Sequence, residues 1–123
     1  MSGDRNPILW PDLDSVELPH HTMAVYDRPI GIKLLREDAR TGAEDYLVRY
    51  EAGTRSRWHR YSAGHTIVVL EGRLRVNDDV IGPGSYCHYP AMAVMRHEPA
   101  GDEPCLFLNL FDGPSDVEVV EPG

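Results

Sequence analysis

The sequence is short of cysteine, of long apolar runs and of positive charge. Two cysteines in 123 residues do not make a disulfide framework, and no window reaches the roughly 18 consecutive apolar residues that a membrane span needs. The formal net charge is −8, whereas proteins that bind nucleic acid present a basic patch to the phosphates. The first residues contain no basic stretch followed by an apolar run, so no signal peptide is predicted. The sequence therefore predicts a cytoplasmic protein that binds neither a membrane nor nucleic acid.

Helical periodicity is also missing. No window of a dozen residues repeats apolar side chains at helical spacing, whereas short candidate strands recur between turn signals every 8 to 12 residues or so. Strands are expected over 22–26, 30–35, 45–51, 57–61, 65–70, 73–76, 85–89 and 105–111. The length of 123 residues suits one domain. The prediction is an all-β sandwich or barrel over 22–112, with a proline-rich N-terminal arm (1–21) and an acidic C-terminal tail (113–123).

Histidine is concentrated in the middle of the chain, where four of the six histidines fall between positions 59 and 97. His59 and Tyr61 are two residues apart, so on a strand they point to the same side. A turn over 62–64 precedes His65, which opens the next strand-like run. If the two strands pair, His59 and His65 meet on one inner face and make a metal site plausible. The simpler alternatives are a buried His59 bonded to a backbone carbonyl and a His65 at a strand end on the surface.

The spacing around these histidines resembles the first motif of the cupin superfamily. The sequence reads Gly53-x5-His59-x-Tyr61-x3-His65-x6-Gly72. The motif usually reads Gly-x5-His-x-His-x3-4-Glu-x6-Gly. Tyr61 therefore stands in place of the second histidine, and His65 stands in place of the glutamate.

The second cupin motif, which usually reads Gly-x5-Pro-x-Gly-x2-His-x3-Asn, is matched in part. Gly84 and Pro90 have the expected spacing, but Met92 replaces the second glycine. His97 comes two residues late, and the asparagine is missing. Within the superfamily the chain looks most like small single-domain proteins related to ring-cleaving acetophenone-type dioxygenases and to the cupin half of anti-sigma sensors.

The resemblance implies a cupin-type double-stranded β-helix, a jelly-roll barrel with a metal inside it. Carried over residue by residue, it makes His59, His65 and His97 the metal ligands. Tyr61 is then either a phenolate ligand or a hydrogen-bond donor to a bound water or substrate. His88 is a minority candidate as ligand, and could line the pocket as a proton carrier.

The expected cofactor is a divalent transition metal, with iron or zinc ahead of nickel, copper or manganese. The expected function is an enzyme that acts on a small organic molecule, for example a dioxygenase of diketones or hydroxylated aromatic ketones. The alternatives are an isomerase, cyclase or lyase that uses the metal as a Lewis acid, a non-catalytic metal or ligand sensor, and a barrel whose site has decayed. The resemblance also implies a homodimer, formed by exchange of edge strands or arms.

Overall fold

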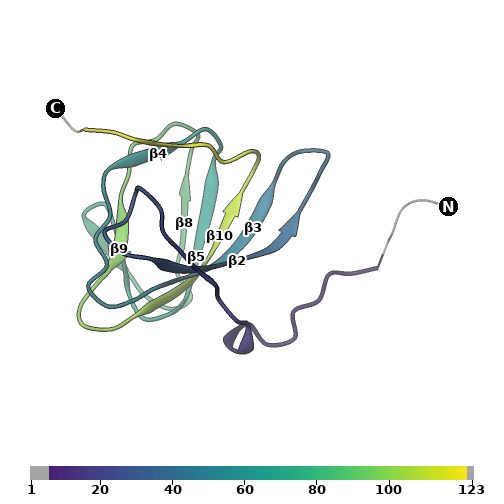
Figure 1. Ribbon diagram of the computed structural model, residues 1–123, viewed down its shortest axis with the longest axis horizontal. Coiled ribbons are helices and arrows are strands. Elements are labelled where there is room, and N and C mark those ends of the chain that lie inside the picture. The colour runs from purple at the N-terminus through teal and green to yellow at the C-terminus, as the bar shows by residue number, and fades with distance from the viewer. Residues whose placement is uncertain (1–5, 122–123) are drawn as a thin grey trace.

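The structure is a computed structural model that describes residues 6–121, in which one short 3-10 helix precedes a series of strands joined by turns (Figure 1). The 3-10 helix η1 is Leu13–Ser15. The strands are β1 (His20–His21), β2 (Ile30–Glu37), β3 (Glu44–Tyr50), β4 (His59–Tyr61), β5 (His65–Glu71), β6 (Leu74–Val76), β7 (Asp79–Ile81), β8 (Tyr86–Tyr89), β9 (His97–Pro99), β10 (Cys105–Phe111) and β11 (Val117–Val119). The all-β prediction is confirmed. Over the described range, no helix has the length and apolar character needed to traverse a bilayer.

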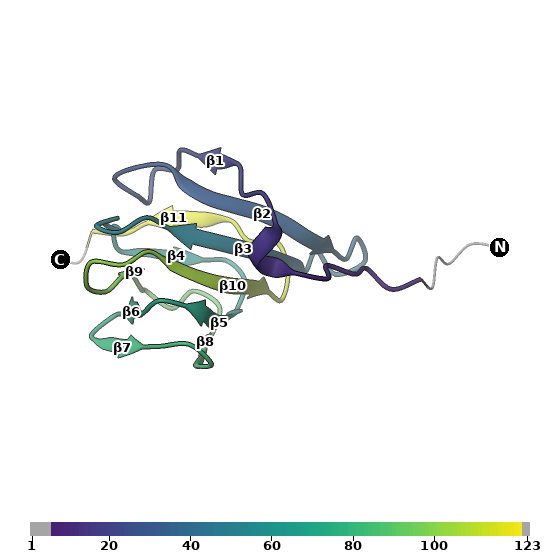
Figure 2. The same ribbon diagram turned by 90° about the horizontal axis from the view of Figure 1, so that it is seen from below.

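The strands make two walls that face one another, with the large sheet on one side and β4 and β9 on the other (Figures 1 and 2). The large sheet has the order β1-β2-β3-β10-β5-β8, and the opposite wall consists of the pairs β11-β4 and β7-β6-β9. An antiparallel bridge between His59 and Met95 joins the two parts of the opposite wall. This is the closed, double-sheet arrangement of a jelly roll, which leaves few strand edges free.

Alternation along the strands fills the space between the walls. On β5, His65, Ile67 and Val69 are buried, while Thr66, Val68 and Leu70 are half-buried. β10 pairs with both β3 and β5, so its inner side chains lie at the centre of the large sheet. The period of two therefore places His65 in the row of apolar residues that forms the core.

Two terminal segments are more ordered than the sequence predicts. The end of the expected arm forms β1, whose His20 and His21 pair with Gly31 and Ile30 of β2. The acidic tail contains β11, which pairs antiparallel with β4 over its three residues. Backbone hydrogen bonds to a neighbouring strand hold both segments, and neither segment has a local pattern strong enough to show this. The outer ends of the predicted arm and tail, 1–5 and 122–123, lie outside the described residues.

Left-handed backbone explains why the first motif has glycine at two positions. One residue of the second motif has the same backbone conformation without being glycine. Gly53 and Gly72 have φ of +84° and +73°, a region that glycine enters without steric cost. Met92, which stands where the second motif has glycine, adopts φ of +68°. Its amide donates a hydrogen bond to the carbonyl of Tyr61 at 2.9 Å. The turn keeps its glycine conformation although the side chain is methionine, and that conformation costs an L-residue about 1–2 kcal/mol.

We expect the substitution Met92→Gly to stabilise the protein by about 0.5 kcal/mol. Relief of the left-handed strain exceeds the extra entropy that glycine gives to the unfolded chain, and the half-exposed Met92 side chain gives up little packing. The midpoint of urea unfolding measures the change. The control is Ala91→Gly at the preceding exposed position, which should destabilise by about 0.5–1 kcal/mol. Equal destabilisation by both variants would contradict the prediction.

Candidate metal centre

Three histidines from three different strands gather inside the barrel. His59 begins β4, His65 begins β5 and His97 begins β9, and each side chain is 0% exposed. The ring centre of His97 lies 5.4 Å from that of His59 and 6.2 Å from that of His65. The structure thus places the three residues expected as ligands together in one buried cluster.

Two of these rings use Nδ1 in a hydrogen bond, and in His59 that bond also defines the tautomer. His59 Nδ1 lies 2.8 Å from the carbonyl oxygen of Arg57, and a carbonyl only accepts, so Nδ1 carries the proton. His97 Nδ1 lies 2.6 Å from the hydroxyl oxygen of Tyr50. Nε2 of both rings is buried without a partner, and in His65 both ring nitrogens are. Buried polar atoms are nearly always paired, so these unpaired nitrogen atoms in one place are suited to share a ligand.

Burial also holds the three imidazoles in the neutral form that binds metals. Loss of solvation lowers the pKa of His59 below its ordinary value of 6.5 and that of His65 to about 4. The pKa of His97 is lowered well below 6.5 for the same reason, with further contributions from His59 and His65. At neutral pH the cluster is therefore uncharged and its lone pairs are available.

Tyr61 lies against two of the three histidines. Its ring centre is 5.2 Å from His59 and 4.9 Å from His65, both edge to face. Loss of solvation raises the pKa of its hydroxyl well above 10, and an interaction with the Tyr26 hydroxyl adds to this shift. The protein's own groups therefore favour the neutral phenol, which can donate a hydrogen bond.

The nitrogen donors are of a type that divalent metals bind, but the rings lie farther apart than they would around a bound ion. Within residues 6–121, no group of three or more His, Cys, Asp or Glu side chains could hold a metal ion as placed. Three imidazoles bound at about 2.1 Å bring their ring centres to roughly 5 Å from one another, compared with 5.4 and 6.2 Å for two pairs here. Because all three rings keep a buried, unpaired Nε2, we take the residues to fit. Binding requires the rings to close around the ion.

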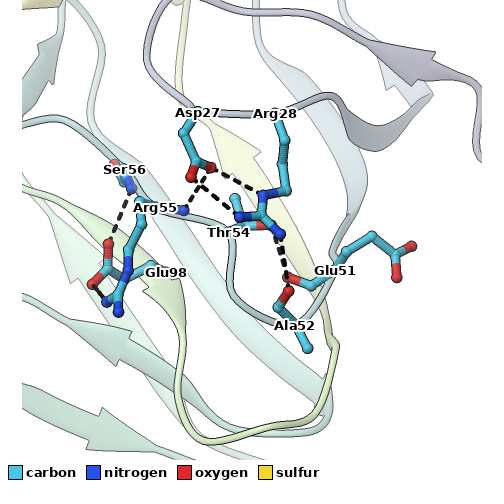
Figure 3. Close-up of polar contacts among 8 residues, drawn as sticks. All are labelled: Asp27, Arg28, Glu51, Ala52, Thr54, Arg55, Ser56 and Glu98. Atoms are coloured by element: carbon cyan, nitrogen blue, oxygen red, sulfur yellow. Dashed lines mark hydrogen bonds and ion pairs between the residues drawn. The ribbon is translucent and has the colours of Figure 1, made fainter.

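A network of polar contacts fixes the loop that leads into β4 (Figure 3). Glu98, which directly follows His97, is 5% exposed. Its carboxylate accepts from the Ser56 amide at 3.0 Å and from the Arg55 guanidinium at 3.3 Å. Asp27 accepts from the Arg55 amide at 2.9 Å. This loop carries the Arg57 carbonyl, so the network couples the strand of His97 to the group that orients His59.

On the other side of the cluster, tyrosine hydroxyls support His97. The Tyr50 hydroxyl lies 2.6 Å from His97 Nδ1 and 2.5 Å from the Tyr26 hydroxyl. Both tyrosines are buried, and desolvation raises the pKa of Tyr26 to about 12. A neutral Tyr50 can thus accept from His97 while it donates to Tyr26. That arrangement keeps the His97 ring in the tautomer with Nε2 free.

We expect Tyr50→Phe to weaken metal binding by about 10- to 100-fold, the usual effect of removing a partner of a ligating histidine. The variant leaves His97 Nδ1 without an acceptor and frees the ring to rotate. Competition with a chromophoric chelator measures the affinity. The matched control is Tyr46→Phe on the same strand, whose hydroxyl donates to Glu44 at 2.9 Å instead. An affinity of Tyr50→Phe equal to that of Tyr46→Phe would contradict this role.

His88 does not belong to the cluster, so its expected role as a proton carrier in the pocket is corrected. On β8, Tyr86 and His88 are exposed, whereas Cys87 is half-buried and Tyr89 is buried. His88 Nδ1 lies 3.0 Å from the hydroxyl of Thr66 on the outer side of the sheet. The alternation of β8 is as predicted, but the face that carries Tyr86 and His88 is the outer one. Tyr89 faces inward and stacks on His65, with ring centres 5.3 Å apart.

Sequence reasoning missed Tyr50 as part of the centre. The available signal was its place with Tyr46 and Val48 on one face of β3, but both faces of that strand are partly apolar. A strand with two apolar faces gives no reason to choose the inner one. The partner of Tyr50 also lies 47 residues away along the chain.

Comparison with known proteins agrees with this architecture. Residues 16–115 match the family model described as the ChrR cupin-like domain. The chain belongs to the cupins. Among solved structures, this cupin is similar to a cupin-like protein from Thermotoga maritima, with a TM-score of 0.77 and 18% identity over 89% of each chain. None of the curated proteins compared with this cupin is similar to it.

Two further structures show the same fold. An acetylacetone dioxygenase from Acinetobacter johnsonii has a TM-score of 0.76 and 13% identity, covering 99% of this chain and 84% of its own. A cupin 2 conserved barrel domain protein from Rhodopseudomonas palustris has a TM-score of 0.69 and 16% identity, covering 88% of this chain and 79% of its own. At such identities the likeness extends to the fold. The jelly-roll prediction and the family resemblance are therefore confirmed.

Proposed function

We propose that this cupin is a metal-dependent enzyme that acts on a small organic molecule. The observation that carries the proposal is the cluster of three buried, neutral histidines, each with an unpaired Nε2. An ordinary core would hold apolar side chains there, because an unpaired buried polar atom costs about 1–3 kcal/mol. Binding of an ion repays that cost, so the arrangement favours a functional centre over a structural one.

In this proposal His59, His65 and His97 hold the metal through Nε2. The bound ion would polarise an oxygen atom of the substrate or, if it is iron, activate O2. Arg57 and Tyr50 orient two of the ligands through their Nδ1 atoms. Three protein ligands leave coordination positions open for substrate, as a catalytic site requires.

Tyr61 serves the substrate rather than the metal in this scheme. Its phenol is neutral and lies against His59 and His65, so it can donate a hydrogen bond to a substrate oxygen next to the ion. The surrounding barrel keeps bulk water away and so strengthens that hydrogen bond.

As the reaction type we propose oxidative cleavage of a diketone or a hydroxylated aromatic ketone by O2. The support for this finer proposal is the similar fold of the acetylacetone dioxygenase from Acinetobacter johnsonii. It is also supported by the three-imidazole donor set, which suits iron among other divalent metals.

Metal content and turnover test the proposal in sequence. Protein purified without chelator should contain close to one equivalent of a transition metal by elemental analysis, and absence of metal would favour a decayed site. The metal-loaded protein should consume O2 with diketones or hydroxylated aromatic ketones, and chelation should stop the consumption. Turnover without O2 would instead indicate Lewis-acid chemistry. Metal binding with no turnover of any of these compounds would indicate a sensor.

A further inference from the structure

A cavity of about 200 Å³ lies on the far side of Tyr61 from the histidine cluster. It lies between the inner face of the large sheet and residues of the segments that precede β2 and contain β11. Tyr61 lines it, and the ring of Tyr61 also packs on His59 and His65. One side of the cavity is thus a side chain that contacts two of the proposed ligands, so the ring of Tyr61 connects a molecule bound in the cavity to the centre.

The lining of this cavity is uncharged. Of its eleven residues, five are aliphatic, four are aromatic and two are polar, and none is Asp, Glu, Lys, Arg or His. An ion placed there would lose its hydration and gain no counter-charge, a cost of several kcal/mol or more. The chain as a whole has a net charge of −8, which adds to the exclusion of anions. The lining therefore favours a neutral guest.

Asn109 supplies the one amide of the lining. It lies on the inner face of β10 between Phe107 and Phe111, and its side chain is 5% exposed. Its Oδ1 is buried and has no hydrogen-bond partner. This position pairs with Tyr46 and Ile67 on the flanking strands. An apolar side chain there would avoid the free-energy cost of an unpaired buried oxygen. The orphaned oxygen indicates that a donor comes from outside the chain.

The size of the cavity suits a guest with one ring in the buried part. An apolar protein cavity of about 150 Å³ binds benzene. The present volume of about 200 Å³ therefore accommodates a six-membered ring with one or two small substituents. Two fused rings with substituents exceed it.

We propose that this cavity binds an uncharged, single-ring-sized molecule whose hydroxyl or N–H group donates a hydrogen bond to Asn109 Oδ1. The remainder of the molecule packs on the aliphatic and aromatic lining, next to Tyr61. Its identification as the substrate rests on the proposed function, whereas binding in the cavity does not require the metal. Among the substrate classes proposed above, the cavity selects hydroxylated aromatic ketones of one ring and disfavours carboxylates.

Titrations with phenol, toluene and benzoate test the proposal, both with protein as purified and after chelator treatment. Phenol and toluene have the same size and differ in the donor, while benzoate adds the negative charge. NMR of methyl groups locates binding through Ile30, Ile32, Val48 and Val117, which line the cavity. We expect phenol and toluene to shift these methyl resonances with or without metal, and benzoate to bind at least about tenfold more weakly than phenol.

The variant Asn109→Leu tests the hydrogen bond. The ratio of the dissociation constants of toluene and phenol should fall by about threefold to tenfold relative to wild type, the worth of one neutral hydrogen bond. The control is Leu108→Asn, which puts an amide on the outer face of the same strand and should leave the ratio unchanged. A second variant, Val117→Trp, places a large ring at a 41% exposed position of the lining. It should abolish binding of phenol and toluene without disturbing the packing of the core.

Three results would overturn the proposal: no shift of the lining methyl groups with any probe, benzoate binding as tightly as phenol, or a ratio unchanged in folded Asn109→Leu. Binding that vanishes on chelation would also overturn it, because the histidine centre would then hold the ligand. Absence of metal from protein that still binds phenol in the cavity would instead count against the proposed enzyme function alone.

Discussion

Replacement of His59 by alanine is expected to lower metal affinity by at least about 100-fold, beyond the range of a partner that only orients a ligand. The variant removes the ring whose tautomer is defined most clearly, because the Arg57 carbonyl fixes the proton on Nδ1. Two imidazoles and no carboxylate are then left for the ion. Elemental analysis after gel filtration should show well under one tenth of an equivalent, and His97→Ala should behave in the same way.

The chain offers a matched control in His88. It is a histidine of the same barrel on a paired strand, but it is exposed and bonded to Thr66. His88→Ala should therefore keep the metal content and affinity of the wild type. Full metal content in folded His59→Ala and His97→Ala, measured beside this control, would exclude the proposed centre and leave the cluster without a role in binding.

The largest expected effect on stability is that of Gly72→Ala. Gly72 lies between β5 and β6 with φ of +73°, and a Cβ atom there would lie 2.1 Å from the carbonyl oxygen of Pro104. Both the strained backbone and the collision with a main-chain atom have to be relieved by moving the start of β10. We expect a loss of about 3 kcal/mol or more in the free energy of unfolding. That loss corresponds to a decrease in Tm of roughly 10 °C or more.

Gly84→Ala separates the two contributions. Gly84 has φ of +85°, but a Cβ atom there would meet nothing within 4 Å. It should cost only the backbone strain, about 1–2 kcal/mol. Thermal unfolding of both variants under one condition gives the difference between their losses of stability. That difference is the free-energy cost of the collision. A Gly72→Ala variant no less stable than Gly84→Ala would show that the turn relaxes freely.

The fold was accessible from the sequence because its signals are local. Alternation on β5 and β10 and turns rich in glycine and proline mark seven of the strands within a few residues. The short strands β1, β7, β9 and β11 were not predicted, and the strand expected over 22–26 does not form. The pair Gly53 and Gly72 frames the first motif, since both positions need left-handed backbone that glycine supplies. Met92 shows the limit of such reasoning, because its residue type departs from the motif while its backbone does not.

By itself the sequence determined an all-β cupin barrel and the three histidines that belong together. Only the tertiary structure decided that the face of His88 is outside, that Tyr50 supports His97, and that the tail adds a strand to β4. The physical reason is that the period of two assigns side chains to alternate faces but does not say which face is buried. That choice comes from pairings between segments distant in sequence, and the same pairings create the cavity beside Tyr61 with the orphaned oxygen of Asn109.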